Sequence, residues 1–175
     1  MKRRDFISLV GGAAATWPLA VRAQQPGRMR RIGVLMGVGE NDPEGKASLA
    51  AFTQGLADLG WTDGRNLRMD VRWAAADVDR MRILAKELVD LQPDVILANT
   101  TPVTAALQRE TRTIPIVFAA VSDPVGDGFV AGLPRPGGNL TGFITEEASM
   151  AGKRLATVVN LYIEPNREAR AGCVD

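Results

Sequence analysis

The sequence of 175 residues contains no histidine. Histidine is the commonest general base and the commonest metal ligand in proteins, and it activates the nucleophile of Ser-His and Cys-His enzymes. The sequence also has no clustered cysteines and no closely spaced carboxylates that would form a cage for a metal ion. We therefore expect no catalytic residue, no metal site and no cofactor, and the composition argues against an enzyme.

Cysteine and net charge are scarce as well. The lone cysteine, Cys173, cannot form an intrachain disulfide even in an oxidising compartment, and it lies far from any position for lipid attachment behind an N-terminal leader. The chain has 21 basic and 20 acidic residues, and several of the basic ones fall within residues 1–25. The remainder has no cationic excess, so we expect neither nucleic acid nor anionic lipid as a partner.

Residues 1–25 have the pattern of a bacterial export signal. A paired arginine at residues 3–4 precedes the apolar stretch Phe6–Leu19, and small residues follow over Ala20–Ala23. The arginine pair resembles the twin-arginine signal, which predicts cleavage near Gln24 and a periplasmic protein. The alternative is an N-terminal membrane anchor, but the stretch contains glycine and proline and is shorter than the roughly 20 apolar residues of a span. We expect no stable membrane anchor.

Beyond the leader, short apolar runs alternate with amphipathic segments. Unbroken apolar runs at Ile32–Met36, Val95–Ala98 and Ile116–Ala119 are typical of strands buried on both faces. Apolar residues recur at helical spacing over Leu49–Leu59 and Met81–Leu91. This alternation predicts parallel strands joined by right-handed crossovers, with helices on both faces of the sheet.

One further strand predicts the order of the sheet. Leu67–Trp73 alternates apolar and charged residues, so only one of its faces can be well buried. Such a strand suits the edge of a sheet, and the second strand is an edge strand in the doubly wound order 2-1-3-4-5. Asp77 is a candidate N-cap for the next helix. The predicted fold class is α/β, with a doubly wound, mostly parallel, Rossmann-like sheet.

In this topology ligands bind beyond the carboxyl ends of the strands, at the switch point between the first and third strands. Small and polar residues follow the strands there. The candidate ligand-binding residues are Gly37, Val38, Gly39 and Glu40 after the first strand, Asn99, Thr100 and Thr101 after the third, and Ser122 and Asp123 after the fourth.

Two interpretations of these loops stay open. Thr100 and Thr101 open a helix, where free N–H groups, the positive dipole end and two hydroxyls could hold a carboxylate or phosphate. Threonine before a helix is also an ordinary N-cap, and Ser-Asp-Pro is an ordinary turn. Asp123 could accordingly pair with a ligand ammonium or cap its own turn.

Two nucleotide-binding signatures are nearly matched and are rejected. Gly37–Gly39 could begin a dinucleotide loop, but the third glycine would fall at Asp42, which would repel a pyrophosphate. A phosphate-binding loop ending at Lys46 has one residue too many, and Ala47 replaces the Ser or Thr that would bind magnesium. We interpret Lys46 as a solvated residue at a helix start.

Several segments of the sequence resemble the periplasmic solute-binding proteins of ABC transporters, in the branch with the type I binding-protein fold. The segments are Arg31–Met36, Phe52–Trp61, Gly64–Leu67, Pro93–Ala98, and Ile114–Phe118 with Ser122–Gly126 and Pro136–Gly142. The last set is the most specific to this branch. The resemblance implies a two-lobed receptor that traps a small solute, such as an amino acid, and delivers it to an ABC permease without covalent chemistry. It places the first-lobe ligand site on the loops already named.

The chain also departs from that family. Members are roughly twice as long on the scale of domain sizes, because a second lobe follows the first. We expect the first solute-binding lobe at 26–155, a chain truncated after it, and an irregular tail foreign to the fold at 156–175. Asn160, Pro165 and Asn166 interrupt the apolar pattern of that tail.

Three functions remain open at this point. A solute receptor predicts saturable binding of an amino-acid-like solute. A flavodoxin-like domain of another role would normally carry an acidic cluster or a phosphate loop. A non-functional remnant would bind nothing and fold poorly.

Overall fold

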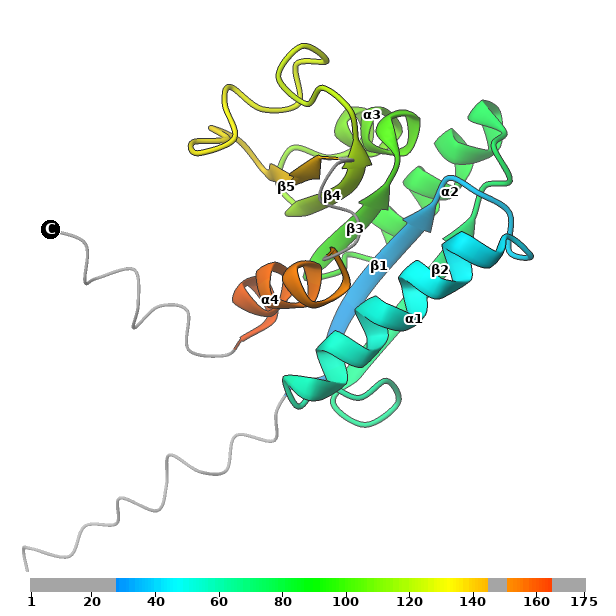
Figure 1. Cartoon of the computed structure of the whole chain (residues 1–175), viewed down its shortest axis with the longest axis vertical. Coiled ribbons are helices and arrows are strands. Elements are labelled where there is room, and N and C mark those ends of the chain that lie inside the picture. The colour runs from blue at the N-terminus through cyan, green and yellow to red at the C-terminus, as the bar shows by residue number, and fades with distance from the viewer. Residues whose placement is uncertain (1–27, 145–150, 165–175) are drawn as a thin grey trace, which may run out of the picture.

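The computed structural model describes residues 28–144 and 151–164, so the leader predicted over residues 1–25 lies outside the described residues. Strands and helices alternate along this part of the chain (Figure 1). They are β1 (Arg30–Met36), α1 (Pro43–Asp58), β2 (Leu67–Trp73), α2 (Val78–Asp90), β3 (Val95–Asn99), α3 (Thr101–Glu110), β4 (Ile116–Val121), β5 (Leu140–Ile144) and α4 (Ala151–Ile163).

The strands form one sheet in the order β2-β1-β3-β4-β5, and every neighbouring pair is parallel. This confirms the α/β class and the predicted order. β2 lies at the edge, as its alternating charges predicted, and its Asp70 lies between Arg31 and Arg68 at 3.2 and 3.5 Å. Asp77 caps α2 as expected, because its Oδ1 accepts hydrogen bonds from the backbone N–H groups of Asp79 and Arg80.

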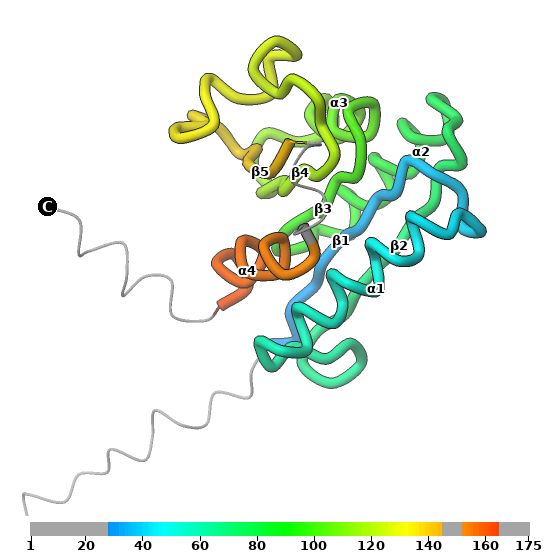
Figure 2. Tube along the Cα trace, in the orientation of Figure 1, coloured from blue at the N-terminus to red at the C-terminus, as the bar shows by residue number. Residues whose placement is uncertain are grey.

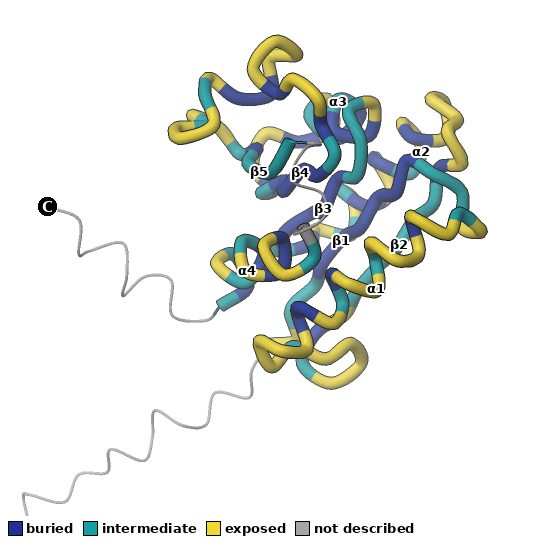
Figure 3. Tube along the Cα trace, viewed as in Figure 1, coloured by how far each residue is buried: buried dark blue, intermediate teal, exposed yellow. Residues whose placement is uncertain are grey.

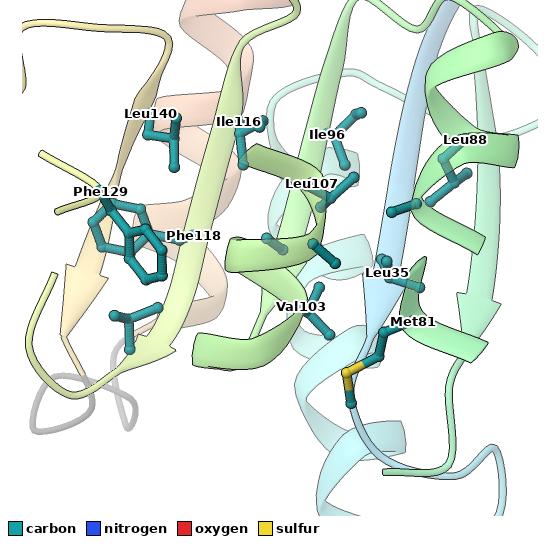
Figure 4. Packing of buried hydrophobic residues seen from close by; sticks show 14 of the residues in the cluster. Leu35, Met81, Leu88, Ile96, Val103, Leu107, Ile116, Phe118, Phe129 and Leu140 are labelled. Carbon is teal, nitrogen blue, oxygen red and sulfur yellow. The ribbon is translucent and has the colours of Figure 1, made fainter. Parts of the chain in front are cut away.

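Helices α2 and α3 cover one face of the sheet. Large side chains from both helices interlock with those of the strands, as Figure 4 shows. The most deeply buried are Leu35, Leu88, Ile96, Val103, Leu107, Ile116 and Phe118, all fully shielded from solvent. Burying a side chain of this size stabilises the fold by about 1.5–3 kcal/mol.

Helices α1 and α4 cover the other face and run in the same general direction. They touch through small residues: a methyl group on Gly152 would lie 2.7 Å from the Cβ of Ala51, and one on Gly55 would lie 2.8 Å from the Cβ of Ala156. Glycine and alanine therefore let the two helices approach closely. The strands lie between these helices and α2 and α3, and in Figure 3 they are mostly buried, while the outer surfaces of α1 and α4 are exposed.

Helix α4 corrects the prediction of an irregular tail from residue 156. Ala156, Val159 and Ile163 are fully buried in the cluster beneath α1. Asn160, taken as an interruption, accepts a hydrogen bond of 2.7 Å from the indole N–H of Trp61. Residues 156–163 thus belong to the fold, because their small and polar residues meet matching partners on α1 and the loop behind it. The rest of the predicted tail, from residue 165, lies outside the described residues.

Polar groups at the amino end of the sheet are well paired. Asp94 accepts hydrogen bonds from the side chain of Arg30 at 3.0 Å and from the backbone N–H of Arg31 at 2.9 Å. The Asn139 amide donates to the carbonyl of Ile114 at 2.7 Å, and Thr111 Oγ1 accepts from the N–H of Ile114 at 3.1 Å. These contacts fix the starts of β1, β3, β4 and β5.

Candidate functional site

Strands β1, β3 and β4 end side by side. Met36 pairs with Asn99, and Asn99 pairs with Ala119, so the last residues of β1 and β3 lie in register with a residue two positions before the end of β4. In Figure 2 the trace leaves all three strands at the same end of the sheet. The loops predicted to form a ligand site therefore share one edge, which we call the rim.

Gly37 and Thr100 approach each other closely within the rim. A methyl group on Gly37 would lie 2.5 Å from Thr100 Oγ1 and 3.2 Å from the carbonyl oxygen of Asn99. Only a residue without a side chain fits there. The glycine after β1 therefore lets the loops after β1 and β3 touch directly, a contact that goes beyond the shared edge that the sequence predicted.

Thr100 has an unusual backbone and an unusual side chain. Its φ is 89°, a value that costs a β-branched residue energy and that proteins retain mainly at functional positions. Its hydroxyl oxygen is buried and has no hydrogen-bond partner in the part of the chain that the structure describes. The hydroxyl does not cap α3 either, although Thr100 occupies the N-cap position. The capping interpretation therefore fails for Thr100.

Helix α3 begins directly behind this hydroxyl. The first backbone N–H groups of a helix have no intrahelical acceptor, and the helix dipole makes this end partially positive. Thr101 is half-buried at the first position of α3, and Pro102 follows it. The backbone N–H of Thr100 already donates to the carbonyl of Ala119 at 3.0 Å. A carboxylate at the rim would meet the remaining donors and the unpaired hydroxyl.

The loop after β4 lies at the same edge, but here the structure favours an ordinary turn capped by its own aspartate. Asp123 Oδ1 accepts a hydrogen bond of 2.8 Å from the N–H of Gly126, so this aspartate caps its own turn. Ser122 and Asp123 are exposed. None of the described contacts joins them to Thr100, so they stay predicted ligand contacts.

The other residues of the first loop are held by the backbone. The carbonyls of Gly37 and Val38 accept hydrogen bonds from the N–H groups of Ala76 and Ala75, at 2.7 and 3.1 Å. Asp42 caps α1 through the N–H of Gly45, which leaves no phosphate loop, while Glu40 and Lys46 are exposed. Gly39 closes the loop by accepting from the N–H of Asp42 at 3.0 Å.

Three alanines at the rim were missed from the sequence. Ala75 and Ala76, after β2, and Ala120, at the irregular end of β4, have φ values of 54°, 60° and 54°. Alanine rarely adopts this left-handed conformation. No sequence signal marks them, because glycine or asparagine would be expected at such positions.

A cavity of about 240 Å³ opens beneath the rim, between the sheet and the first turns of α1 and α4. We call it the niche. Its lining residues are Met36, Ala47, Ser48, Leu49, Ala51, Phe52, Leu97, Asn99, Ala119, Ala120, Gly152 and Leu155. Asn99 belongs both to the niche and to the rim. The side chains of Asn99 and Ser48 make no hydrogen bond with any described residue.

Two other kinds of site are absent from residues 28–144 and 151–164. No three His, Cys, Asp or Glu side chains in that part of the chain lie close enough to hold a metal ion. No helix there is long and apolar enough to cross a membrane.

Comparison with known proteins identifies relatives of one kind. The sequence model of the family described as ABC transporter substrate binding protein matches residues 32–161, which include the rim, the niche and most of α4. A tyrosine-binding protein from Clostridioides difficile (strain R20291) is 38% identical over 91 residues, which are 52% of this chain and 26% of that protein.

Two solved structures are similar in fold. An ABC domain from Streptococcus pneumonia in complex with L-Trp is 30% identical with a TM-score of 0.61, and the match covers 66% of this chain and 38% of that one. The ligand-free, open structure of a substrate-binding protein with adhesive properties from Clostridium difficile is 25% identical with a TM-score of 0.62, covering 82% and 55%. The chain thus spans between a quarter and little more than half of these relatives.

Proposed function

The chain belongs to the family of ABC transporter substrate-binding proteins, and from that premise we propose that it captures an amino acid at the rim as part of a periplasmic uptake receptor. The described residues form one α/β lobe of such a receptor. Capture requires no covalent chemistry, in keeping with a sequence that lacks histidine.

The observation that supports this proposal most is the unpaired hydroxyl of Thr100. Leaving a buried hydroxyl without a partner costs about 1–3 kcal/mol, and proteins rarely leave such a group unpaired. A bound solute would supply the missing partner. The hydroxyl lies next to the start of α3, whose free N–H groups suit a carboxylate. We assign the solute carboxylate to Thr100 and Thr101, with Gly37 packed directly against Thr100.

The relatives favour an amino acid as the solute. One is named for binding tyrosine and another was solved with L-Trp. Asn99, Ser122 and Asp123 are our candidates for contacts with the rest of the solute, the exposed Asp123 carboxylate for its ammonium. Glu40 and the backbone of Val38 and Gly39 would border the site on the β1 side.

Calorimetric titration of the 175-residue chain with L-tyrosine, L-tryptophan, L-phenylalanine and L-alanine tests the proposal. One lobe offers only part of a closed site, so we expect saturable binding with a Kd of about 0.1–1 mM for an amino acid. A cooperatively folded chain that shows no saturable heat with any of these solutes would contradict the proposal and favour the remnant.

Variants at Thr100 test whether its hydroxyl binds the solute. Thr100→Val keeps the β-branched shape but removes the hydroxyl, so we expect affinity to fall about tenfold, the worth of one hydrogen bond to a charged group. Thr100→Ser retains the hydroxyl and should stay within about threefold. Thr113→Val, at an exposed threonine near the amino end of the sheet, is the matched control. Equal effects of Thr100→Val and Thr113→Val would refute the assignment.

The same proposal extends to location and partner. Residues 1–25 would direct export through the twin-arginine route, and the filled receptor would then dock on an ABC permease. Replacing Arg3 and Arg4 by lysine should move the protein from the periplasmic to the cytoplasmic fraction. Unchanged fractionation of that double variant would rule out this route.

A further inference from the structure

A groove of about 200 Å³ lies between α2 and α3. At its base the two helices pack on the sheet and on each other through buried side chains such as Met81, Val103 and Leu107 (Figure 4). Toward the outer surface α3 carries short side chains, which leave a space between the helices open. The residues that line this groove are Val78 and Arg82 of α2 and Pro102, Ala105, Ala106 and Arg109 of α3.

The end of the groove nearest the rim is apolar. Val78, the first residue of α2, is 53% exposed, and Pro102 in the first turn of α3 is exposed as well. Ala105 follows about one turn further along α3 and is half-buried. A partner that covers these groups would remove apolar surface from water, which favours association.

Two arginines supply the charge of the groove. Arg82 donates a hydrogen bond of 2.9 Å to Asp79, which is itself 85% exposed. The guanidinium of the exposed Arg109 has no hydrogen bond or ion pair with any residue that the structure describes. No aspartate or glutamate is among the residues that line the groove. The groove therefore offers guanidinium donors that a partner's carboxylate can pair with in a bidentate manner.

The groove also adjoins the loops of the rim. The N–H of Ala76 donates to the carbonyl of Gly37 at 2.7 Å, and Val78 follows two residues later. On the other helix, Pro102 lies two residues after Thr100. A partner seated on the groove would therefore touch the starts of two helices whose preceding segments hold the proposed solute site.

We infer that this groove docks a segment of a protein partner, with an apolar side chain of that segment against Val78 and a carboxylate on Arg82 and Arg109. The inference rests on the proposed function and deepens it, because a solute receptor has to be recognised by its permease beside the solute site. Apolar contact supplies affinity, and the paired charges fix the orientation. A flat anionic membrane fits less well, because Asp79 and Glu110 stand beside the two arginines and would repel it.

A helical peptide of roughly 15 residues, with leucine and glutamate four positions apart, is the probe. In an NMR titration of the 175-residue chain without any amino acid, we expect saturable shifts at the amides of Val78, Arg82 and Arg109. The expected Kd is about 0.1–1 mM, in the range of a weak, transient contact. A peptide with lysine in place of the glutamate should bind at least about tenfold more weakly.

Two double variants with the same loss of charge separate docking from general attraction. Arg82→Gln with Arg109→Gln should weaken the glutamate peptide at least about tenfold. Arg112→Gln with Arg135→Gln removes two exposed arginines outside the groove, and the affinity should stay within about twofold. Ala105→Leu fills the groove without a change of charge and should weaken the peptide at least about tenfold. Equal weakening by both double variants, or equal binding of the lysine peptide, would overturn the inference.

The peptide titration and the amino-acid titration can fail separately. If the peptide binds as expected but no amino acid binds, the proposed function fails and the groove stands as a docking site for an acidic protein segment. If amino acids bind but the peptide causes no saturable shifts, the docking inference is overturned and the proposed function stands. Phosphatidylglycerol vesicles that bind the chain through Arg82 and Arg109 more tightly than the peptide does would assign the groove to lipid and also overturn the inference.

Discussion

The two ends of the sheet differ in how their polar groups are satisfied. At the amino end, Asp94, Thr111 and Asn139 all have hydrogen-bond partners at 2.7–3.1 Å in their closest contacts. At the rim, the hydroxyl of Thr100 is buried and unpaired with respect to the described residues, and Asn99 beside it has no side-chain partner among them.

The backbone conformation also differs between the two ends of the sheet. Of the described non-glycine residues with positive φ, Ala75, Ala76, Thr100 and Ala120 lie at the rim end and Gln92 at the amino end. Gln92 directly follows the last residues of α2, where a left-handed residue is ordinary. Strained backbone thus gathers at the rim end, together with the unpaired hydroxyl of Thr100. The other buried side-chain oxygen of the described residues without a hydrogen bond, Asp70 Oδ2, lies on β2 between Arg31 and Arg68. The amino end stabilises the lobe, whereas the rim is where we propose that the solute binds.

The largest effect is expected at the amino end. Asp94→Ala removes two hydrogen bonds to a carboxylate that is 12% exposed, and it leaves Arg30 without its ion-pair partner. We expect a loss of about 2–3 kcal/mol in the free energy of unfolding, measured with urea, and unchanged solute affinity. Asp58→Ala removes an exposed contact with Gln54 and should cost less than about 0.5 kcal/mol. Loss of solute affinity in a folded Asp94→Ala protein would remove the contrast between the ends.

The next effect is expected at the rim. Gly37→Ala places a methyl group against Thr100 Oγ1 and the carbonyl of Asn99, so the loops must separate. We expect a cost of about 1–2 kcal/mol in stability and at least about tenfold weaker solute binding. Gly138→Ala is the control, since Gly138 is exposed at the amino end of β5 and no atom lies within 4 Å of its added methyl group. Tight binding by Gly37→Ala would show that the contact with Thr100 is unnecessary.

Two glycine substitutions compare backbone strain at the ends. Gln92→Gly and Ala120→Gly each relieve a positive φ and should raise the free energy of unfolding by about 0.5–1 kcal/mol. Only Ala120→Gly should weaken solute binding, because it loosens the end of β4 at the rim. Calorimetric titration of both proteins checks this, and equal affinities would assign the strain at Ala120 to packing alone.

The smallest effect is expected on the surface of α2, away from both ends. The hydrogen bond from Lys86 to Asp90, followed by their charge attraction, raises the pKa of Lys86 above 10.5. The pair thus stabilises the fold below that pH and loses its effect as pH rises through the raised pKa. Lys86→Gln should lower the urea midpoint slightly at about pH 8 and not at about pH 12. A large change at about pH 8 would contradict the small value of exposed pairs.

The strand order could be predicted because buried and exposed positions follow a pattern that is recognisable in the sequence. Unbroken apolar runs marked β1, β3 and β4, and the alternating charges of Leu67–Trp73 marked the edge strand. Strand order then placed Gly37, Thr100 and Ser122 at one edge. That much of the candidate site follows from topology, because parallel strands end on the same side.

Helix α4 and the niche could not be predicted, because both depend on small residues. Gly152 and Ala156 form the contact with α1, yet they add little to an apolar pattern. Asn160 looked like an interruption because its partner, Trp61, lies 99 residues away in sequence. Ala120 has a left-handed backbone that only tertiary contacts impose. These features depend on packing between residues far apart in the sequence, which a local sequence pattern does not reveal.

An NMR titration of the 175-residue chain with L-phenylalanine tests the division between the two ends most directly. Backbone amide shifts should be saturable and confined to the loops that carry Gly37, Thr101 and Ser122. The amide of Arg31, bonded to Asp94, should not move. Saturable shifts centred on Arg31 and Asp94, with the rim amides unchanged, would contradict the account.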